Sequence, residues 1–420
     1  MTVDRRVVIL GAGFAGLNCA KALGNRPGVT VTVLDRRNHH LFQPLLYQVA
    51  MAGLSPADIA APVRSILSQY RNIETLQSVV ERIDPTARIV HADAGTFEYD
   101  YLVLATGAKH SYFGNEQWEE YAPGLKTLSQ ATEIRRRVLM AFEDAEICRD
   151  TQRRKQLLTF VIVGGGPTGV ELAGAMGEMT RYTLTREFRR IDSRQTRILL
   201  LEGGPRILPS FSPEHSAKAL RVLEGLGVQV WTNAKVTDIS EHGVAVGGEF
   251  IQAATVLWAA GVRGSSLAEK SGFETDSAGR AIVESDLSVK GHPEVFVAGD
   301  LAHVLDEHGK MVPGMAPAAL QEGRYLGRLI RDDIAGKPRK PFRYWNKGQM
   351  ATIGRSQAVL ESGRLNLSGM AAWMAWLVIH IYYLTGFRNR FFVVLSWAWS
   401  YLHFQRGARL IVRKEWKFFS

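Results

Sequence analysis

Two glycine-rich turns of the same pattern lie about 150 residues apart in this chain of 420 residues. Each follows a run of apolar, β-branched residues and precedes a stretch with helical spacing. In that setting bare backbone N–H groups and a helix N-terminus bind a pyrophosphate. One such turn is weak evidence, but two in one chain indicate two nucleotides bound face to face. The turns are Gly11-Ala12-Gly13-Phe14-Ala15-Gly16 after Val7–Leu10, and Gly164-Gly165-Gly166-Pro167-Thr168-Gly169 after Phe160–Val163.

An acidic residue ends the strand that follows each turn. Asp35 stands 24 residues after Gly11, and Glu202 follows the second turn after a longer helix and an insertion. A carboxylate in this position holds ribose hydroxyls. It also repels a 2′-phosphate, so the second site is expected to prefer NADH to NADPH. The alternative, that both are ordinary surface acids at strand ends, stays open at this point.

Length and composition indicate a folded protein of two to three domains, since 46% of the residues are hydrophobic. The two cysteines, Cys19 and Cys148, cannot form a disulfide framework or a thiolate zinc site. Their spacing also excludes catalysis through an exchanging dithiol. We expect Cys19 to pack in a helix, Cys148 to be inert, and the chain to be intracellular.

The first nucleotide-binding region closes with a strand and a glycine turn at Tyr101–Gly107, and the second repeats this at Val256–Gly261. A further strand ends in Gly299-Asp300. In a flavoprotein with two dinucleotide sites, this aspartate returns to the first nucleotide and holds its ribityl or pyrophosphate oxygens. The order of these motifs therefore favours a flavin in the first site.

The resulting fold class is α/β, with two Rossmann-like dinucleotide-binding domains, the second inserted in the first, and a C-terminal membrane-associated helical segment. The expected boundaries are 1–120 with 275–340 for the FAD-binding domain, 121–274 for the NADH-binding domain and 341–420 for the membrane-anchoring domain.

This arrangement resembles the two-dinucleotide-binding-domain flavoproteins, and more narrowly the type II NADH dehydrogenases, which are single-subunit NADH:quinone oxidoreductases. The resemblance covers essentially the whole chain, and the segments around Pro44 and Gln321 are more specific than the glycine turns. The segments that carry it are His40–Ala50, Gly164–Ala173, Leu201–Pro209, Met315–Glu322 and Lys347–Gly354.

The resemblance and the motifs together imply FAD in the first site and NADH, the substrate, in the second. The residues expected to bind them are Gly11, Gly13, Phe14, Ala15, Gly16, Asp35, Arg36, Pro44, Ala105, Thr106, Gly107, Gly299, Asp300, Ala316 and Pro317 for FAD, and Gly164, Gly166, Pro167, Thr168, Gly169, Glu202, Ala260 and Gly261 for NADH.

Three residues are expected to serve catalysis, namely Glu171, Gln321 and Lys347, and Pro317 is expected to prepare the flavin site before them. Pro317 predicts a helix start whose positive dipole end stabilises the anionic reduced flavin. Gln321, four residues on, could donate a hydrogen bond to a quinone carbonyl. The family commonly has Ala-Gln-x-Ala-x-Gln here, so Pro317 replaces the first glutamine. By resemblance, Glu171 helps proton delivery and Lys347 assists at the quinone. The alternatives, a helix-start acid and a solvated lysine, stay open.

No metal site is expected. His39 and His40 are adjacent, so their side chains point apart on a strand, and no Cys, Asp or Glu cluster completes a ligand set.

The C-terminal region is apolar, because residues 365–387 contain no Asp, Glu, Lys or Arg. Hydropathy alone favours a spanning helix. Basic residues from Arg388 onward favour the inner side, as does the preceding nucleotide-binding part. The second apolar run, 391–404, is too short to return across a bilayer. We therefore expect a helical pair lying in one leaflet of the membrane, with aromatic residues at the headgroup boundary, including Trp373, Trp376, Trp397 and Trp399. An ordinary buried helical hairpin is the alternative.

The predicted function is FAD-dependent transfer of two electrons from NADH to a membrane quinone in a respiratory chain, without proton pumping. Expected partners are the quinone, the bilayer surface through residues 365–420 and a second copy in a homodimer, with no nucleic acid. Without an amphipathic leader before the first strand, the cytoplasmic face of a bacterial inner membrane is the expected location. The alternatives are a soluble NADH-dependent reductase of a protein electron carrier and a basic nucleic-acid-binding flavoprotein.

Overall fold

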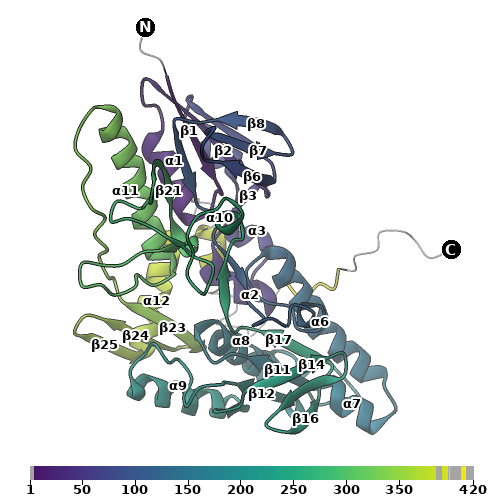
Figure 1. The fold of residues 1–420 in the computed structure, drawn as a ribbon. Helices are drawn as coiled ribbons and strands as arrows, with labels where there is room; N and C mark the ends of the chain where they lie inside the picture. Colours follow the sequence, from purple (N-terminus) through teal and green to yellow (C-terminus); the bar gives the residue numbers. More distant parts are fainter. Residues whose placement is uncertain (1–3, 385–389, 396, 398–407, 413–420) are drawn as a thin grey trace, which may run out of the picture. The chain divides into compact units, whose positions relative to one another are not determined.

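A computed structural model describes residues 4–384, 390–395, 397 and 408–412. The chain forms two compact units, whose elements are labelled in Figure 1. Unit 1 consists of Met1–Leu41, Ala60–Lys109 and Val262–Lys347, and unit 2 of Phe42–Ile59, His110–Gly261 and Gly348–Ser420.

This division differs from the expected three domains in two respects. The segment Phe42–Ile59, which contains Pro44, groups with unit 2 and not with the first nucleotide-binding region. The chain from Gly348 onward also groups with unit 2 and does not form a domain of its own. In both cases the reason is packing against α8 of unit 2 (Pro167–Glu178), which contacts α2 (Leu46–Ala50) and β23 (Gln349–Gly354).

Six strands form the main sheet of unit 1, in the order β20-β21-β9-β1-β2-β5. Neighbours run parallel, except that β20 is antiparallel to β21. The strands read as continuous apolar runs because both faces of a parallel sheet are covered. The two long helices α1 and α11 lie side by side in this unit (Figure 1). Their bounds are β1 Arg5–Leu10, β2 Val29–Asp35, β5 Ile73–Gln77, β9 Tyr101–Leu104, β20 Ser288–Val289, β21 His292–Val297, α1 Phe14–Leu23 and α11 Ala316–Ile334.

Smaller elements complete unit 1. They are β3 His39–Leu41, β4 Ala60–Pro62, α4 Val63–Leu67, β6 Val80–Asp84, β7 Ile89–Ala92, β8 Gly95–Glu98, β18 Val262–Gly264, α10 Leu267–Lys270, β19 Ala281–Ile282, η4 Gly299–Leu301 and β22 Ala302–His303; β10, Ala108–His110, ends in unit 2.

Unit 2 repeats the pattern with four parallel strands in the order β13-β12-β11-β17. Every residue of β11 is buried, as expected for a central strand. The elements are η1 Gln43–Leu45, α2 Leu46–Ala50, α3 Pro56–Ile59, α5 Trp118–Tyr121, α6 Leu128–Ile147, α7 Thr151–Leu157, β11 Thr159–Val163, α8 Pro167–Glu178, the π-helical turn η2 Met179–Thr183, η3 Ser193–Gln195, β12 Arg197–Leu201, α9 Pro213–Gly225, β13 Val228–Trp231, β14 Val236–Ser240, β15 Gly243–Val246, β16 Glu249–Gln252 and β17 Thr255–Trp258.

The C-terminal part of unit 2 starts with a three-stranded antiparallel sheet and continues with helical segments, and the described residues 408–412 form neither helix nor strand. Its elements are β23 Gln349–Gly354, β24 Gln357–Ser362, β25 Leu365–Gly369 and α12 Met370–Tyr383. The prediction of a helical pair is therefore wrong at its beginning, because the first five residues of the apolar run form the strand β25. Of the second run, residues 391–395 and 397 are helical, and the remainder, with Trp399, lies outside the described residues. Among the described residues, no helix is both long and apolar enough to cross a membrane.

A polar cluster joins this C-terminal sheet to the N-terminus of α9. The Glu361 carboxylate on β24 accepts hydrogen bonds from Ser212 N (2.8 Å) and Gln349 Nε2 (3.1 Å), and lies 2.7 Å from His215 Nδ1. Burial alone would raise the pKa of Glu361, but the bonds from Ser212, Gln349 and His215 outweigh it and lower the pKa to about 2. The charge sits at the N-terminus of α9, where the helix dipole favours an anion.

Candidate active site

The first glycine turn joins β1 to α1 and leaves the helix N-terminus open. Gly11 has a positive φ of 97°, and Gly13 caps α1 without a side-chain hydrogen bond. A Cβ on Gly16 would lie 1.9 Å from Gly11 O, so the first helical turn rests directly on the turn. A Cβ on Gly13 would meet no described atom within 4 Å. That open side is a cradle for a pyrophosphate, which the first N–H groups of α1 can bind.

The second turn, between β11 and α8, has the same geometry. Gly164 has a φ of 108°, and Gly166 caps α8 without a side-chain bond, with Pro167 in the first helical turn. A Cβ on Gly169 would lie 1.8 Å from Gly164 O, whereas one on Gly166 would meet no described atom within 4 Å. The residues therefore fit a second dinucleotide.

The two acids lie where the sequence predicts and brace the glycine turns. Asp35 accepts from Ala12 N (2.7 Å) and Arg37 N (2.8 Å). Glu202 accepts from Gly165 N (2.7 Å) and Gly204 N (2.6 Å). A carboxylate has about four lone-pair sites, so each retains acceptor capacity for ribose hydroxyls.

The remaining candidates of unit 1 gather at the carboxyl edge of its sheet. A Cβ on Gly11 would lie 2.5 Å from Ala105 O, so the Ala105-Thr106-Gly107 turn after β9 touches the first glycine turn. The Gly299-Asp300 turn follows β21, the neighbour of β9, and Ala316-Pro317 begins α11 as predicted. Arg36 is exposed after β2. Ligands bind at this edge of open α/β sheets.

The candidates of unit 2 gather at the equivalent edge of the second sheet. A Cβ on Gly164 would lie 2.7 Å from Ala260 N, so the Ala260-Gly261 turn after β17 lies against the second glycine turn. Pro44 lies in η1 of unit 2, outside the unit that holds the other expected FAD residues.

Two residues that brace turns of unit 1 are missing from the sequence-based set of site residues. His40 is buried, and its Nδ1 lies 2.9 Å from Ala12 O, so Nδ1 carries the proton because a carbonyl can only accept. Burial lowers the pKa of His40 to about 4. His40 lies on β3 and contacts the glycine turn 28 residues earlier, so no local pattern in the sequence predicts this contact. In the sequence, the adjacent pair His39 and His40 bears only on metal binding. Among the described residues no cluster could hold a metal ion.

The other missing residue is Glu322 on α11. It is 3% exposed, and its Oε2 accepts from Gly299 N at 2.5 Å, so it braces the Gly299-Asp300 turn. Burial raises the pKa of Glu322 to about 7, and the nearby Asp300 carboxylate acts in the same direction. The one feature of the sequence that could have pointed to Glu322 is its place directly after Gln321.

The three catalytic candidates lie in different units. Gln321 and Lys347 belong to unit 1, and Glu171 to unit 2. The amide of Gln321 pairs with the backbone of Trp345, and Lys347 Nζ lies 4.9 Å from the centroid of the Trp345 ring. Glu171 lies on α8, where burial raises its pKa to about 8 against a backbone hydrogen bond at Thr352. The Glu171 carboxyl therefore keeps its proton to a higher pH than an ordinary glutamate.

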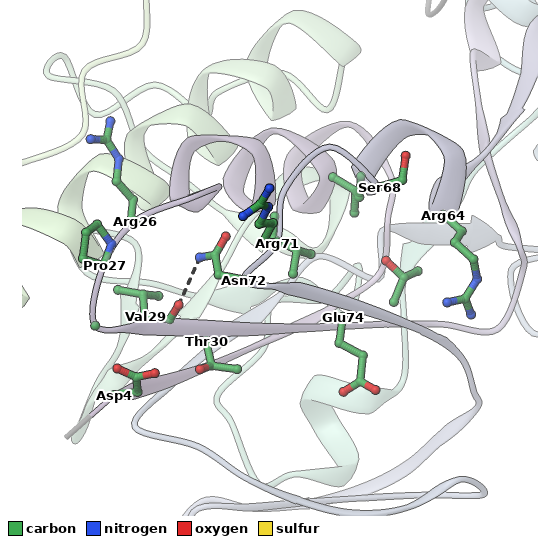
Figure 2. A pocket seen from close by; sticks show the side chains of 14 residues that line it. Asp4, Arg26, Pro27, Val29, Thr30, Arg64, Ser68, Arg71, Asn72 and Glu74 are labelled. Atoms are coloured by element: carbon green, nitrogen blue, oxygen red, sulfur yellow. Dashed lines mark hydrogen bonds between the residues drawn. The ribbon is translucent and has the colours of Figure 1, made fainter.

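An open hollow of about 730 Å³ lies elsewhere in unit 1, around the amino ends of β2 and β5 (Figure 2). Arg26, Arg64 and Arg71 line it, and Asn72 Nδ2 donates to Val29 O at its floor (3.0 Å). The glycine turn of unit 1 follows β1 at the carboxyl edge of the same sheet, so the hollow at the amino ends is not part of this candidate site.

The fold and the paired turns define a pyridine-nucleotide oxidoreductase. Residues 5–323 match the pyridine nucleotide-disulphide oxidoreductase family. Two relatives from Mycobacterium tuberculosis, the type II NADH:quinone oxidoreductases NdhA and Ndh, are 46% and 42% identical over 97% and 98% of this chain and 89% and 91% of their own. The structure of NDH2 from Plasmodium falciparum in complex with NADH superposes with a TM-score of 0.88 at 21% identity, covering 98% of this chain and all of that one. The chain belongs to the type II NADH:quinone oxidoreductase family, which confirms the resemblance read from its sequence.

A matched pair of glycine substitutions separates nucleotide binding from folding. Gly166→Ala is expected to leave the melting temperature and the flavin spectrum unchanged, because its Cβ points into open space. It should raise the KM for NADH about 10-fold or more by displacing the pyrophosphate. Gly169→Ala should lower the free energy of unfolding by about 1–3 kcal/mol or more, since its Cβ would overlap Gly164 O. Thermal denaturation and steady-state kinetics give both quantities. An unchanged KM in Gly166→Ala would place the dinucleotide elsewhere.

Proposed function

We propose that the protein passes two electrons from NADH, bound in unit 2, through FAD, bound in unit 1, to a membrane quinone in a respiratory chain, without pumping protons. Membership of the type II NADH:quinone oxidoreductase family supports the reaction. The observation that carries the assignment of sites is the pair of glycine turns, each open at its N-cap glycine and each braced by its own acid.

The flavin is assigned to unit 1 because that unit holds more than a pyrophosphate cradle. Asp300 lies at the same sheet edge as the first glycine turn, where its carboxylate can bind hydroxyls of a ribityl chain. The N-terminus of α11 begins at Ala316 without a side-chain cap, so its N–H groups and dipole favour negative charge nearby. The flavin, once bound, supplies the redox chemistry, and these residues supply position and electrostatics.

Unit 2 is assigned to NADH because its candidate site consists of the glycine turn, which can bind a pyrophosphate, and the acid Glu202. The further residues that favour a flavin belong to unit 1. Glu202 accepts from Gly165 N of the glycine turn with one carboxylate oxygen and from Gly204 N with the other, which fixes its charge beside the proposed ribose position. That fixed charge disfavours the 2′-phosphate of NADPH.

The apolar face of α12 supports attachment to a lipid surface. Met370, Met374, Val378 and Tyr382 recur every four residues and are 48–68% exposed, so they share one face of the helix. The opposite face, with Trp376 and His380, is buried. Trp376 is buried, so it does not serve as an expected boundary residue. Trp397 packs against Trp376, and its Nε1 donates to Gln48 Oε1 (2.7 Å). We infer monotopic attachment at the cytoplasmic face of a bacterial inner membrane by residues 365–420, in a homodimer.

Anaerobic stopped-flow absorbance tests the proposed reaction. One equivalent of NADH should bleach the flavin of the purified protein, and a short-chain quinone should restore its colour rapidly. NADPH should bleach it at least about tenfold more slowly because of the Glu202 charge. Bleaching that persists after quinone addition would exclude quinone as the acceptor. Equal rates with the two nucleotides would exclude selection by Glu202.

Glu171 is proposed to donate a proton during quinone reduction. Its pKa of about 8 predicts that the rate of flavin reoxidation by quinone falls as the pH rises through about 8, because the ionised form cannot donate. Glu171→Gln should be slower at pH 7, by about tenfold or more, and should lose this pH dependence. Bleaching by NADH should change little. Parallel pH profiles for the two proteins would remove Glu171 from proton transfer.

The membrane assignment is tested by charging the exposed face of α12. The double variant Met374→Glu, Val378→Glu should bind anionic phospholipid vesicles about tenfold or more weakly than the parent protein, because two apolar side chains leave the lipid. Co-sedimentation with the vesicles measures this affinity. Phe250→Glu, at an exposed apolar residue of β16, is the matched control and should bind normally. If the double variant binds vesicles normally but becomes monomeric, this face is the dimer interface.

A further inference from the structure

The amide of Gln321 forms three hydrogen bonds within unit 1. Nε2 donates to Trp345 O (3.0 Å) and to Pro317 O (3.1 Å), and Oε1 accepts from Trp345 N (3.0 Å). The orientation of the amide is fixed by this pattern, because a backbone N–H can only donate and the atom facing it must be the oxygen.

With these bonds made, the Gln321 amide has no N–H group left to donate to a quinone. A glutamine amide has two N–H groups, and both are used by backbone carbonyls. Donation to a quinone carbonyl, which the sequence suggested, would require breaking one of these bonds. The side chain of Gln321 therefore has a different primary role in this structure.

That role is to supply the backbone hydrogen bonds of Trp345 that a helix or a neighbouring strand would otherwise supply. Residues 337–348 form neither helix nor strand, so their backbone groups need other partners. Gln321 satisfies both the N–H and the C=O of Trp345, as a neighbouring strand would. Its own position is set by α11, where the bond to Pro317 O ties the amide to the preceding helical turn.

The segment held in this way presents two side chains. The Trp345 indole is 70% exposed, and Lys347 Nζ lies 4.9 Å from the centroid of its ring. A cation at this distance from an indole is attracted by the ring. Fixing the Trp345 backbone thus limits where the ring can lie, and the ring attracts the ammonium group.

We propose that Gln321 is a positioning residue that acts on quinone reduction through the Trp345–Lys347 segment, which is the part of unit 1 that contacts the quinone headgroup. This proposal rests on the proposed quinone reaction. A flat, electron-rich indole and an ammonium donor suit a flat ring with carbonyl oxygens.

Gln321→Met keeps the length of the side chain and removes its hydrogen bonds, so it is the main test. Hydrogen–deuterium exchange of the holoprotein should show faster exchange of the Trp345 amide, by about tenfold or more. The quinone KM should rise about tenfold, in line with the loss of one or two hydrogen bonds, while flavin bleaching by NADH should keep its rate. Gln69→Met, at an exposed glutamine of unit 1 with one bond to Ile66 O (3.3 Å), is the matched control.

A double-mutant cycle separates positioning from direct contact. If Gln321 acts through Lys347, then Gln321→Met in a Lys347→Met background should add little to the effect on quinone KM. Additive effects, or a raised KM with unchanged exchange at Trp345, would show that Gln321 contacts the quinone itself and overturn the proposal. Faster exchange with unchanged quinone kinetics would also overturn it. If the parent protein is not reoxidised by quinone at all, the proposed reaction fails, and the exchange result still reports on the Gln321–Trp345 bonds.

Discussion

Direct contact between helix and glycine turn is the constraint on which both nucleotide sites depend. In each unit the third glycine of the motif lies so close to the first that a methyl group would overlap its carbonyl oxygen. This contact aims the first N–H groups of the helix at the space beside the second glycine, where a pyrophosphate fits. Each turn is then braced by an acid at the end of the next strand of its nucleotide-binding motif, Asp35 or Glu202, so one carboxylate orders each turn.

The order of strands brings the other site residues to the same place. Parallel strands end at one edge, so turns that are far apart in sequence lie against the first glycine turn of unit 1: Ala105 lies beside Gly11, and Gly299 beside Ala15. The sequence predicted this part well, because each strand is a local apolar run followed by a glycine turn. The start of α11 at its first-turn proline was equally local and is confirmed.

The parts that escaped prediction depend on contacts between distant residues. Gln321 finds its partner 24 residues away in a segment without periodicity, and only the structure shows that its donors are occupied. His40 braces Ala12 across 28 positions. The apolar run that begins at Leu365 starts as a strand, which hydropathy cannot distinguish from a helix over five residues. The segment Phe42–Ile59 belongs to unit 2 because of packing, which no local motif reports.

The alternation of the chain between its units sets an order for its synthesis. Six segments alternate between the two units, so the chain passes from one to the other five times. The four-stranded sheet of unit 2 has all its strands once Trp258 has been made, whereas the sheet of unit 1 waits for β21 and its helix α11. On a ribosome, unit 2 can therefore assemble its sheet while unit 1 is still open, and the incomplete sheet of unit 1 exposes the edge of β9 until β21 is added. Stalled translation between these points would leave a product with one finished nucleotide fold and one unpaired strand edge.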